Sequence, residues 1–161
     1  NIGQYGEHQL KSVHIPASVK TLGDNAFVGM AGLQTVTFAE GSKLESIGNY
    51  AFENCISLAS VEFAEGNAIK SLGTSYDSEY AVFRNTTALK SITLPKSLVS
   101  IKESAFENCS LLKSVSFAEG SELNFIGASA FRACCAGKSR CIPQSRRPCR
   151  RLQRLFLQSV P

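Results

Sequence analysis

Residues 33–58 read LQTVTFAEGSKLESIGNYAFENCISL, and this stretch decides the fold. An Ala-Phe pair occupies 51–52, and a Leu follows six residues after the Phe. The same Phe-to-Leu spacing recurs at three further phenylalanines: Phe27, Phe83 and Phe106. At Phe131 the phrase fails, because Gly137 stands where the Leu is expected. Steps of 23 to 31 residues between copies indicate a stacked array of similar units.

Each unit begins at a Leu and follows one order of elements. The opening leucines are Leu10, Leu33, Leu58, Leu89 and Leu112. Alternating apolar and polar residues, as in Val36-Thr-Phe38, predict a short half-buried strand. A turn containing Gly or Pro comes next, and a second apolar pair such as Leu44 and Ile47 follows it. The Ala-Phe segment then returns the chain, which we expect as a turn or a single helical turn.

No unit of this size can bury its own apolar side, so the copies must bury one another's. We therefore predict a solenoid of about five repeats, with short parallel β-strands on one face and turns or short helical turns on the other. Like positions should stack at about 4.8 Å, and each opening strand should pair in parallel with the next.

The copies at 19–27 and 47–55 resemble the BspA-like (Treponema pallidum type) leucine-rich repeats, whose pattern includes Ile-Gly-x-x-Ala-Phe-x-x-Cys. The resemblance covers about residues 10–134, so we predict that this range forms the solenoid. Residues 1–9 carry Ile2-Gly3 in the Ile-Gly slot and are interpreted as the remnant of a preceding repeat. The sequence therefore reads as a fragment of a longer repeat array.

Charge divides the chain into two unlike parts. Residues 1–131 hold nine Lys and Arg against thirteen Asp and Glu, a net of −4. Residues 132–161 hold eight Lys and Arg and no acid, a net of +8. The acidic repeat region has no basic face, which argues against nucleic-acid binding. The sequence contains no apolar run long enough to span a membrane.

The tail at 135–161 shares neither period nor charge with the repeats. Its arginines, such as Arg146 and Arg147, could contact phosphate or an anionic membrane. Leu152, Leu155 and Phe156 could instead form a short amphipathic helix. We favour a third hypothesis, a frameshift: a displaced reading frame can restore Gly-x-x-Ala-Phe close to the expected repeat position. On this hypothesis the tail is disordered and has no selected function.

Three cysteines fall in one column, three residues after the repeat Phe: Cys55, Cys109 and Cys134. Met30 and Thr86 share the column, so small apolar packing explains it. Cys55 and Cys109 lie two repeats apart, about 10 Å by strand spacing, which exceeds the reach of a disulfide. We interpret the three as buried free thiols.

No residue pattern indicates an enzyme. The two histidines, His8 and His14, are paired with no Cys or Ser nucleophile. Cys134 and the tail cysteines Cys135, Cys141 and Cys149 lack the Cys-x-x-Cys pairs of structural zinc sites. We therefore expect no catalytic residue, no metal, no cofactor and no small-molecule substrate.

The outer side of the strands is the predicted binding surface, because solenoids recognise partners through such extended faces. Two polar columns flank the buried Val or Ile of each strand. The first column holds Ser12, Thr35, Ser60, Ser91 and Ser114, and the second holds His14, Thr37, Glu62, Thr93 and Ser116. Solvation alone would also account for polar residues here.

The third repeat carries an insertion: nine residues, 74–82, separate Gly73 from Phe83, where other copies have three. Insertions in repeat proteins form loops on one face, often the binding face. Tyr76 and Tyr80 are suitable contact residues, since each combines apolar area with a hydroxyl. Asp77 is a further candidate, and a neutral insertion remains the alternative.

The family resemblance implies a cell-surface or secreted protein that binds a protein or host extracellular-matrix ligand in adhesion. Two alternatives remain open from the sequence. The repeats could act as a structural spacer that holds another domain away from the surface. The basic tail could instead bind an anionic partner.

Overall fold

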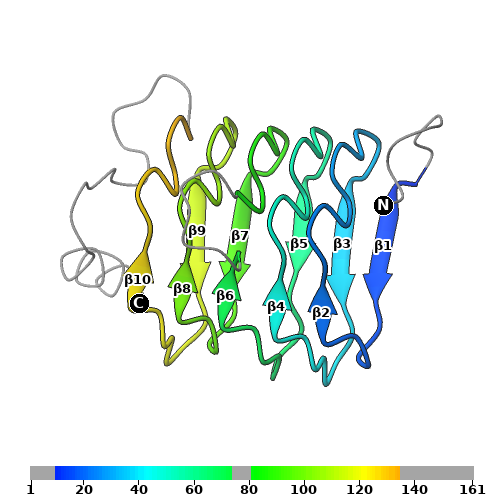
Figure 1. Ribbon diagram of the computed structural model, residues 1–161, viewed down its shortest axis with the longest axis vertical. Coiled ribbons are helices and arrows are strands. Elements are labelled where there is room, and N and C mark those ends of the chain that lie inside the picture. The colour runs from blue at the N-terminus through cyan, green and yellow to red at the C-terminus, as the bar shows by residue number, and fades with distance from the viewer. Residues whose placement is uncertain (1–9, 74–80, 135–161) are drawn as a thin grey trace.

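The structure, a computed structural model, describes residues 10–73 and 81–134. The chain winds into a solenoid in which each repeat contributes two strands on opposite sides of one core (Figure 1). The longer strands are β1 (Ser12–Ile15), β3 (Thr35–Phe38), β5 (Ser60–Glu62), β7 (Ser91–Leu94) and β9 (Ser114–Phe117). The two-residue strands are β2 (Thr21–Leu22), β4 (Ser46–Ile47), β6 (Ser71–Leu72), β8 (Ser100–Ile101) and β10 (Phe125–Ile126). The predicted repeat solenoid is confirmed.

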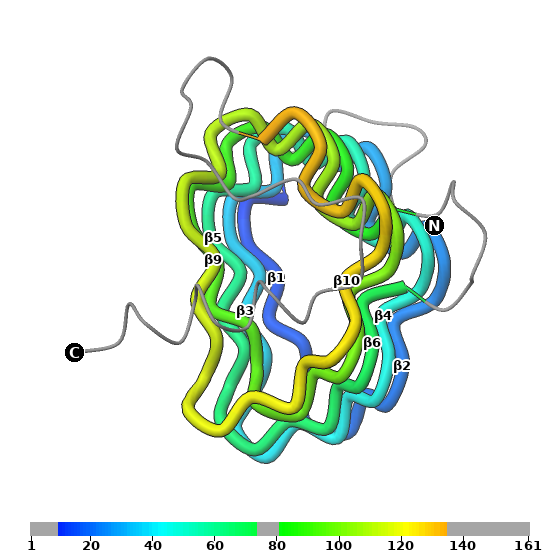
Figure 2. Tube along the Cα trace, turned by 90° about the vertical axis from the view of Figure 1, so that its left-hand side faces the viewer, coloured from blue at the N-terminus to red at the C-terminus, as the bar shows by residue number. Residues whose placement is uncertain are grey.

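The two strand sets form separate walls, which Figure 2 shows down the solenoid axis. The short strands make one continuous parallel sheet in the order β10-β8-β6-β4-β2. The sequence pattern showed these segments only as a second apolar pair. Each contributes one inward apolar residue, such as Ile47, so burial of a single side chain holds each two-residue strand on the core.

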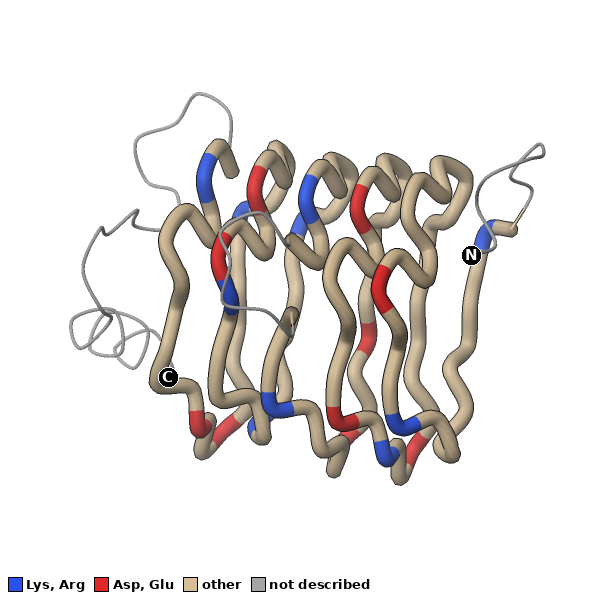
Figure 3. The backbone as a smooth tube through the Cα atoms, in the orientation of Figure 1, with Lys and Arg blue, Asp and Glu red and all other residues tan. Residues whose placement is uncertain are grey.

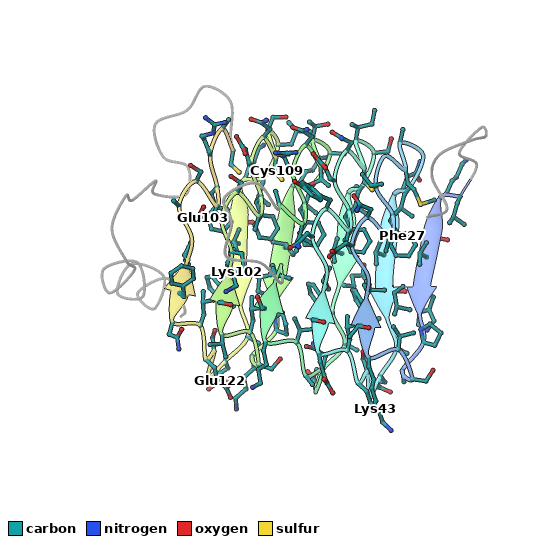
Figure 4. All side chains as sticks on the ribbon, viewed as in Figure 1. Phe27, Lys43, Lys102, Glu103, Cys109 and Glu122 are labelled. Carbon is teal, nitrogen blue, oxygen red and sulfur yellow. The ribbon has the colours of Figure 1, made fainter. Side chains whose placement is uncertain are left out.

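Like side chains stack along the core, as the repeat predicts. Leu33, Leu58, Leu89 and Leu112 are fully buried. The repeat phenylalanines form one continuous stack from Phe27 to Phe131, with successive ring centroids 5.2 Å apart. Figure 4 labels Phe27 at one end of it. Because every ring covers the next, no single repeat carries a complete core.

The Ala-Phe segments are tight turns, and the described residues contain no helix. Residues two before and two after the Phe have positive φ in most copies, for example Asn25 at 57° and Asn54 at 58°. A right-handed helix excludes such residues, so the predicted helical turn does not form. The bends instead orient backbone N–H groups along the solenoid axis, toward the next repeat. Phe27 N–H donates to Ala51 O, and Phe106 N–H donates to Ala130 O.

Two side-chain columns reinforce these turns and were not predicted. One residue after the Phe, Arg84 Nε donates to Glu53 Oε1 at 2.7 Å and Arg132 Nε to Glu107 Oε1 at 2.6 Å. The alternating acidic and basic residues are visible along the upper turns in Figure 3. Two residues after the Phe, Asn85 Nδ2 donates to Asn54 Oδ1 at 2.8 Å. The stacked like positions therefore bond to one another rather than only to water.

Close backbone contact explains the Gly of the Ile-Gly slot in two copies. A Cβ at Gly48 would lie 2.6 Å from Asp24 N, and one at Gly127 would lie 2.5 Å from Glu103 N. The turn packed behind these two glycines leaves no room for a side chain, whereas a Cβ at Gly23 would meet nothing within 4 Å. In one copy Lys102 occupies the glycine slot. The residue at the same slot in the preceding repeat is Gly73, which has φ of 90° and packs against Lys102.

Candidate partner-binding face

The outward sides of β1, β3, β5, β7 and β9 form one wall, here named the strand face. Alternating burial along these strands sends the apolar residues inward and the polar residues outward. The predicted candidates at outward positions are Ser12, His14, Thr35, Thr37, Ser60, Glu62, Ser91, Thr93, Ser114 and Ser116, all exposed or half-buried. Their outward placement is established, while their role in binding stays a prediction.

The strand face is rich in hydroxyls and poor in charge. Across neighbouring strands, His14 Nδ1 and Thr37 Oγ1 are hydrogen-bonded at 2.9 Å. Along β5, Ser60 Oγ donates to Glu62 Oε1 at 2.9 Å. Glu62 is the one carboxylate on these five strands. Such a surface recognises a partner by hydrogen bonds and shape rather than by strong electrostatic attraction.

The strand face is interrupted between β5 and β7, which corrects the prediction that every opening strand pairs with the next. β1, β3 and β5 form one sheet, and β7 and β9 form another. A groove of about 280 Å³ lies between them. It is lined by Ser60, Val61, Glu62, Phe63, Ser91, Ile92 and Thr93. The groove brings together four of the predicted candidates from two repeats.

Proline explains part of the interruption. At the end of the longer strands, Ala39 N–H donates to Ile15 O at 2.9 Å and Ala118 N–H donates to Leu94 O at 3.1 Å. The matching residue after β7 is Pro95, which has no N–H to donate. Pro95 therefore cannot make the corresponding hydrogen bond to Phe63 O. In addition, β5 is one residue shorter than β3 and β7.

The opposite wall presents a second polar column that the sequence interpretation missed. Its outward residues in register are Thr21, Ser46, Ser71, Ser100 and Phe125. Ser100 Oγ donates to Ser71 Oγ at 3.2 Å across β8 and β6. The signal was present, because a small hydroxyl precedes the second apolar residue in four copies.

The insertion candidates Tyr76, Asp77 and Tyr80 lie outside the described residues. The chain enters the insertion after Gly73, which directly follows β6. β6 belongs to the wall across the core from β5 (Figure 2). Gly73, the last described residue before the insertion, therefore lies on the side opposite the strand face.

The cysteine column is buried, as predicted. Each thiol donates to the Phe carbonyl one repeat earlier: Cys55 to Phe27 at 3.1 Å and Cys109 to Phe83 at 3.1 Å. Burial raises the pKa of Cys55 to about 12. A hydrogen bond from Cys134 is the main cause that lowers the pKa of Cys109, and the same contact raises the pKa of Cys134. Figure 4 labels Cys109 within this column.

Within residues 10–73 and 81–134, no three His, Cys, Asp or Glu side chains gather closely enough to hold a metal ion. The same ranges contain no helix with the length and apolar character needed to cross a bilayer.

Known structures share this architecture. A leucine-rich cell surface protein from Faecalibacterium prausnitzii is 23% identical, with a TM-score of 0.55 over 78% of this chain and 37% of its own. A leucine-rich repeat protein from Bacteroides ovatus is 26% identical, with a TM-score of 0.55 over 80% of this chain and 36% of its own. The pneumococcal vaccine antigen PcpA is 24% identical, with a TM-score of 0.50 over 72% of this chain and 32% of its own. The chain thus spans about a third of each of these proteins.

No curated protein matches the chain significantly. The family model for the BspA type leucine rich repeat region matches in six copies, over residues 3–134 and 77–149. The match spans both walls, the Phe stack and the cysteine column. The chain belongs to the BspA-type leucine-rich repeat family.

Proposed function

We propose that this chain is a non-enzymatic protein-binding module of a cell-surface or secreted protein, and that it recognises its partner through the strand face. Adhesion to a host extracellular-matrix protein is the role that we favour. Support for the location comes from the relatives, one of which is described as a cell surface protein and another as a vaccine antigen.

The groove between β5 and β7 is the observation that carries the proposal. Elsewhere on this wall, neighbouring strands pair in parallel ladders. At the groove, β5 and β7 belong to separate ladders, so this point differs from the rest of the wall. The hydroxyls of Ser60, Ser91 and Thr93 line the groove. Directional hydrogen bonds at a recessed point give a partner a fixed register on an otherwise uniform face.

A pair of matched substitutions tests the face. Thr93→Arg fills the groove with a long charged side chain, while Thr21→Arg makes the same change on the exposed outer side of β2 in the opposite wall. Attachment of the full chain would be measured on plates coated with an extracellular-matrix preparation. We expect Thr93→Arg to weaken attachment about tenfold or more, as for a central interface residue, and Thr21→Arg to leave it unchanged.

Equal attachment of both variants would contradict a role for the strand face. The double change Tyr76→Ala and Tyr80→Ala then decides between the remaining possibilities. Loss of attachment in that variant would move the binding site to the insertion. Unchanged attachment in all variants, or no attachment by the native chain, would favour the structural spacer.

A further inference from the structure

Two of the three described cysteines occupy the same position in adjacent repeats. Cys109 lies in the turn of Phe106, and Cys134 lies in the turn of Phe131. Cys109 Sγ donates to Phe83 O at 3.1 Å, and Cys134 Sγ donates to Phe106 O at 3.0 Å. The two thiols therefore make equivalent hydrogen bonds to the backbone, displaced by one repeat along the axis.

The spacing between them suits a disulfide. Stacked strands lie about 4.8 Å apart, and the Phe106 and Phe131 rings of these two turns are 5.2 Å apart. One repeat earlier in the same column, Thr86 Oγ1 and Cys109 Sγ are only 3.1 Å apart. A disulfide needs Cα atoms separated by about 4.4–6.8 Å, which one repeat step satisfies.

Cys55 is excluded by the same geometry. Thr86 occupies the column between Cys55 and Cys109, so these two cysteines are about 10 Å apart, two strand spacings. The separation of this pair led to the expectation of free thiols along the column. Cys109 and Cys134, by contrast, lie only one repeat apart.

We propose that Cys109 and Cys134 are a covalent modification site, which a small-molecule disulfide such as oxidised glutathione converts into an intramolecular disulfide that joins the last two described turns. The proposal does not depend on the binding role of the strand face.

The reaction is a pair of thiol–disulfide exchanges. One cysteine loses its proton and attacks a sulfur of the external disulfide, whose S–S bond breaks and releases one thiolate. The second cysteine loses its proton, attacks the protein sulfur of the mixed disulfide, and releases the second thiolate. The two protons end on the two released thiols, and two electrons pass from the cysteines to the external disulfide.

Both thiols are shielded in the folded state, with Cys109 fully buried and Cys134 8% exposed. Exchange therefore needs a local opening of the last described turn, which costs less than global unfolding. Once formed, the bond closes a loop of 26 residues, counted from 109 to 134, and should stabilise the end of the array.

The test uses the full chain with Cys135, Cys141 and Cys149 each changed to Ser, so that only the three column cysteines remain. The folded protein is incubated with oxidised glutathione at pH 8 and digested with trypsin without reduction. Cys109 falls in fragment 103–113, Cys134 in 133–138 and Cys55 in 44–70. We expect fragments 103–113 and 133–138 to be joined, and 44–70 to keep a free thiol. The Tm should rise by about 10 °C, and a reductant should reverse the rise.

Three controls make the result decisive. Changing Cys134 to Ser should abolish the crosslink and the Tm rise, while changing Cys55 to Ser should leave both. The same oxidation in urea should also produce crosslinks to Cys55, because only the folded structure keeps Cys55 away from Cys109 and Cys134. The proposal is overturned if the folded protein keeps three free thiols, accumulates only mixed disulfides, or joins Cys55 to either partner.

Discussion

The two walls of the solenoid are built from the same repeats, yet one is continuous and the other is divided. The wall of two-residue strands runs unbroken from β2 to β10, and the Ala-Phe turns beside it bond from each repeat to the next. The wall of longer strands is split between β5 and β7. Longer strands thus do not guarantee a longer sheet, because each step depends on the residues that join one repeat to the next.

The difference assigns separate tasks to the two sides. The Phe stack, the Glu and Arg column and the Asn column all lie in the turns that follow the short strands and lead to the next longer strand. The groove lies on the divided wall, whose outward side chains are mainly hydroxyls. We therefore expect substitutions at the turns to change stability, and substitutions at the groove to change binding with little effect on stability.

The largest effect is expected at the centre of the ring stack. Phe83 is fully buried between Phe52 and Phe106, with both centroids 5.2 Å away. Phe83→Ala removes both contacts and leaves a cavity, so the free energy of unfolding should fall by about 3–5 kcal/mol. Urea denaturation measures the loss. Ile56→Ala, at a side chain that is 51% exposed, is the control and should cost far less. Equal losses would show that the stack does not hold the array together.

A smaller effect is expected in the Asn column. Asn85 has φ of 62°, donates to Asn54 and accepts from Asn108. Asn85→Ala removes the side-chain bonds and places a Cβ-bearing residue that lacks local hydrogen bonding in the left-handed region, at a cost of about 1–2 kcal/mol. Asn85→Gly keeps the backbone relaxed and should cost less in the same denaturation assay. A larger loss for Gly than for Ala would mean that the backbone conformation is not the governing factor.

The ion-pair column should contribute about 1 kcal/mol per buried acid. Glu107 is buried and bonded to Arg132, whose side chain is 64% exposed and so remains solvated when the acid is lost. Glu107→Gln should destabilise by that amount. The matched change Glu122→Gln removes the exposed pair with Lys70 and should cost less than about 0.5 kcal/mol. If the two variants lost the same free energy of unfolding in urea, the buried position of Glu107 would add nothing to its ion pair.

The smallest effect on stability, and the most direct test of the divided wall, is expected at Pro95. Pro95→Ala supplies the missing N–H, worth about 1 kcal/mol when bonded, but frees the unfolded chain by a similar amount. The stability should therefore change little. In the variant, the new amide of residue 95 should exchange as slowly as that of Ala118, whose amide is bonded to Leu94 O. Rapid exchange there would show that proline is not what divides the wall.

The repeat pattern was sufficient for much of the fold. Leu33 and Phe52 mark positions that recur with fixed spacing, and only stacking can bury such columns, so the solenoid, the inward residues and the buried cysteines followed from spacing alone. The outward placement of Thr35 and Thr37 followed from strand alternation. The helical turn was wrong because residues such as Asn25 adopt positive φ, a choice that depends on bonds to the next repeat.

The sequence by itself determined which residues share a column, because a recurring phrase identifies like positions even where the step between copies varies. Only the tertiary structure decided which hydrogen bonds and contacts join one repeat to the next. It showed that the short strands form a continuous second wall, and it showed the groove between β5 and β7. These features depend on hydrogen bonds and contacts between successive repeats, and a period gives the order of the repeats without fixing the bonds that join them.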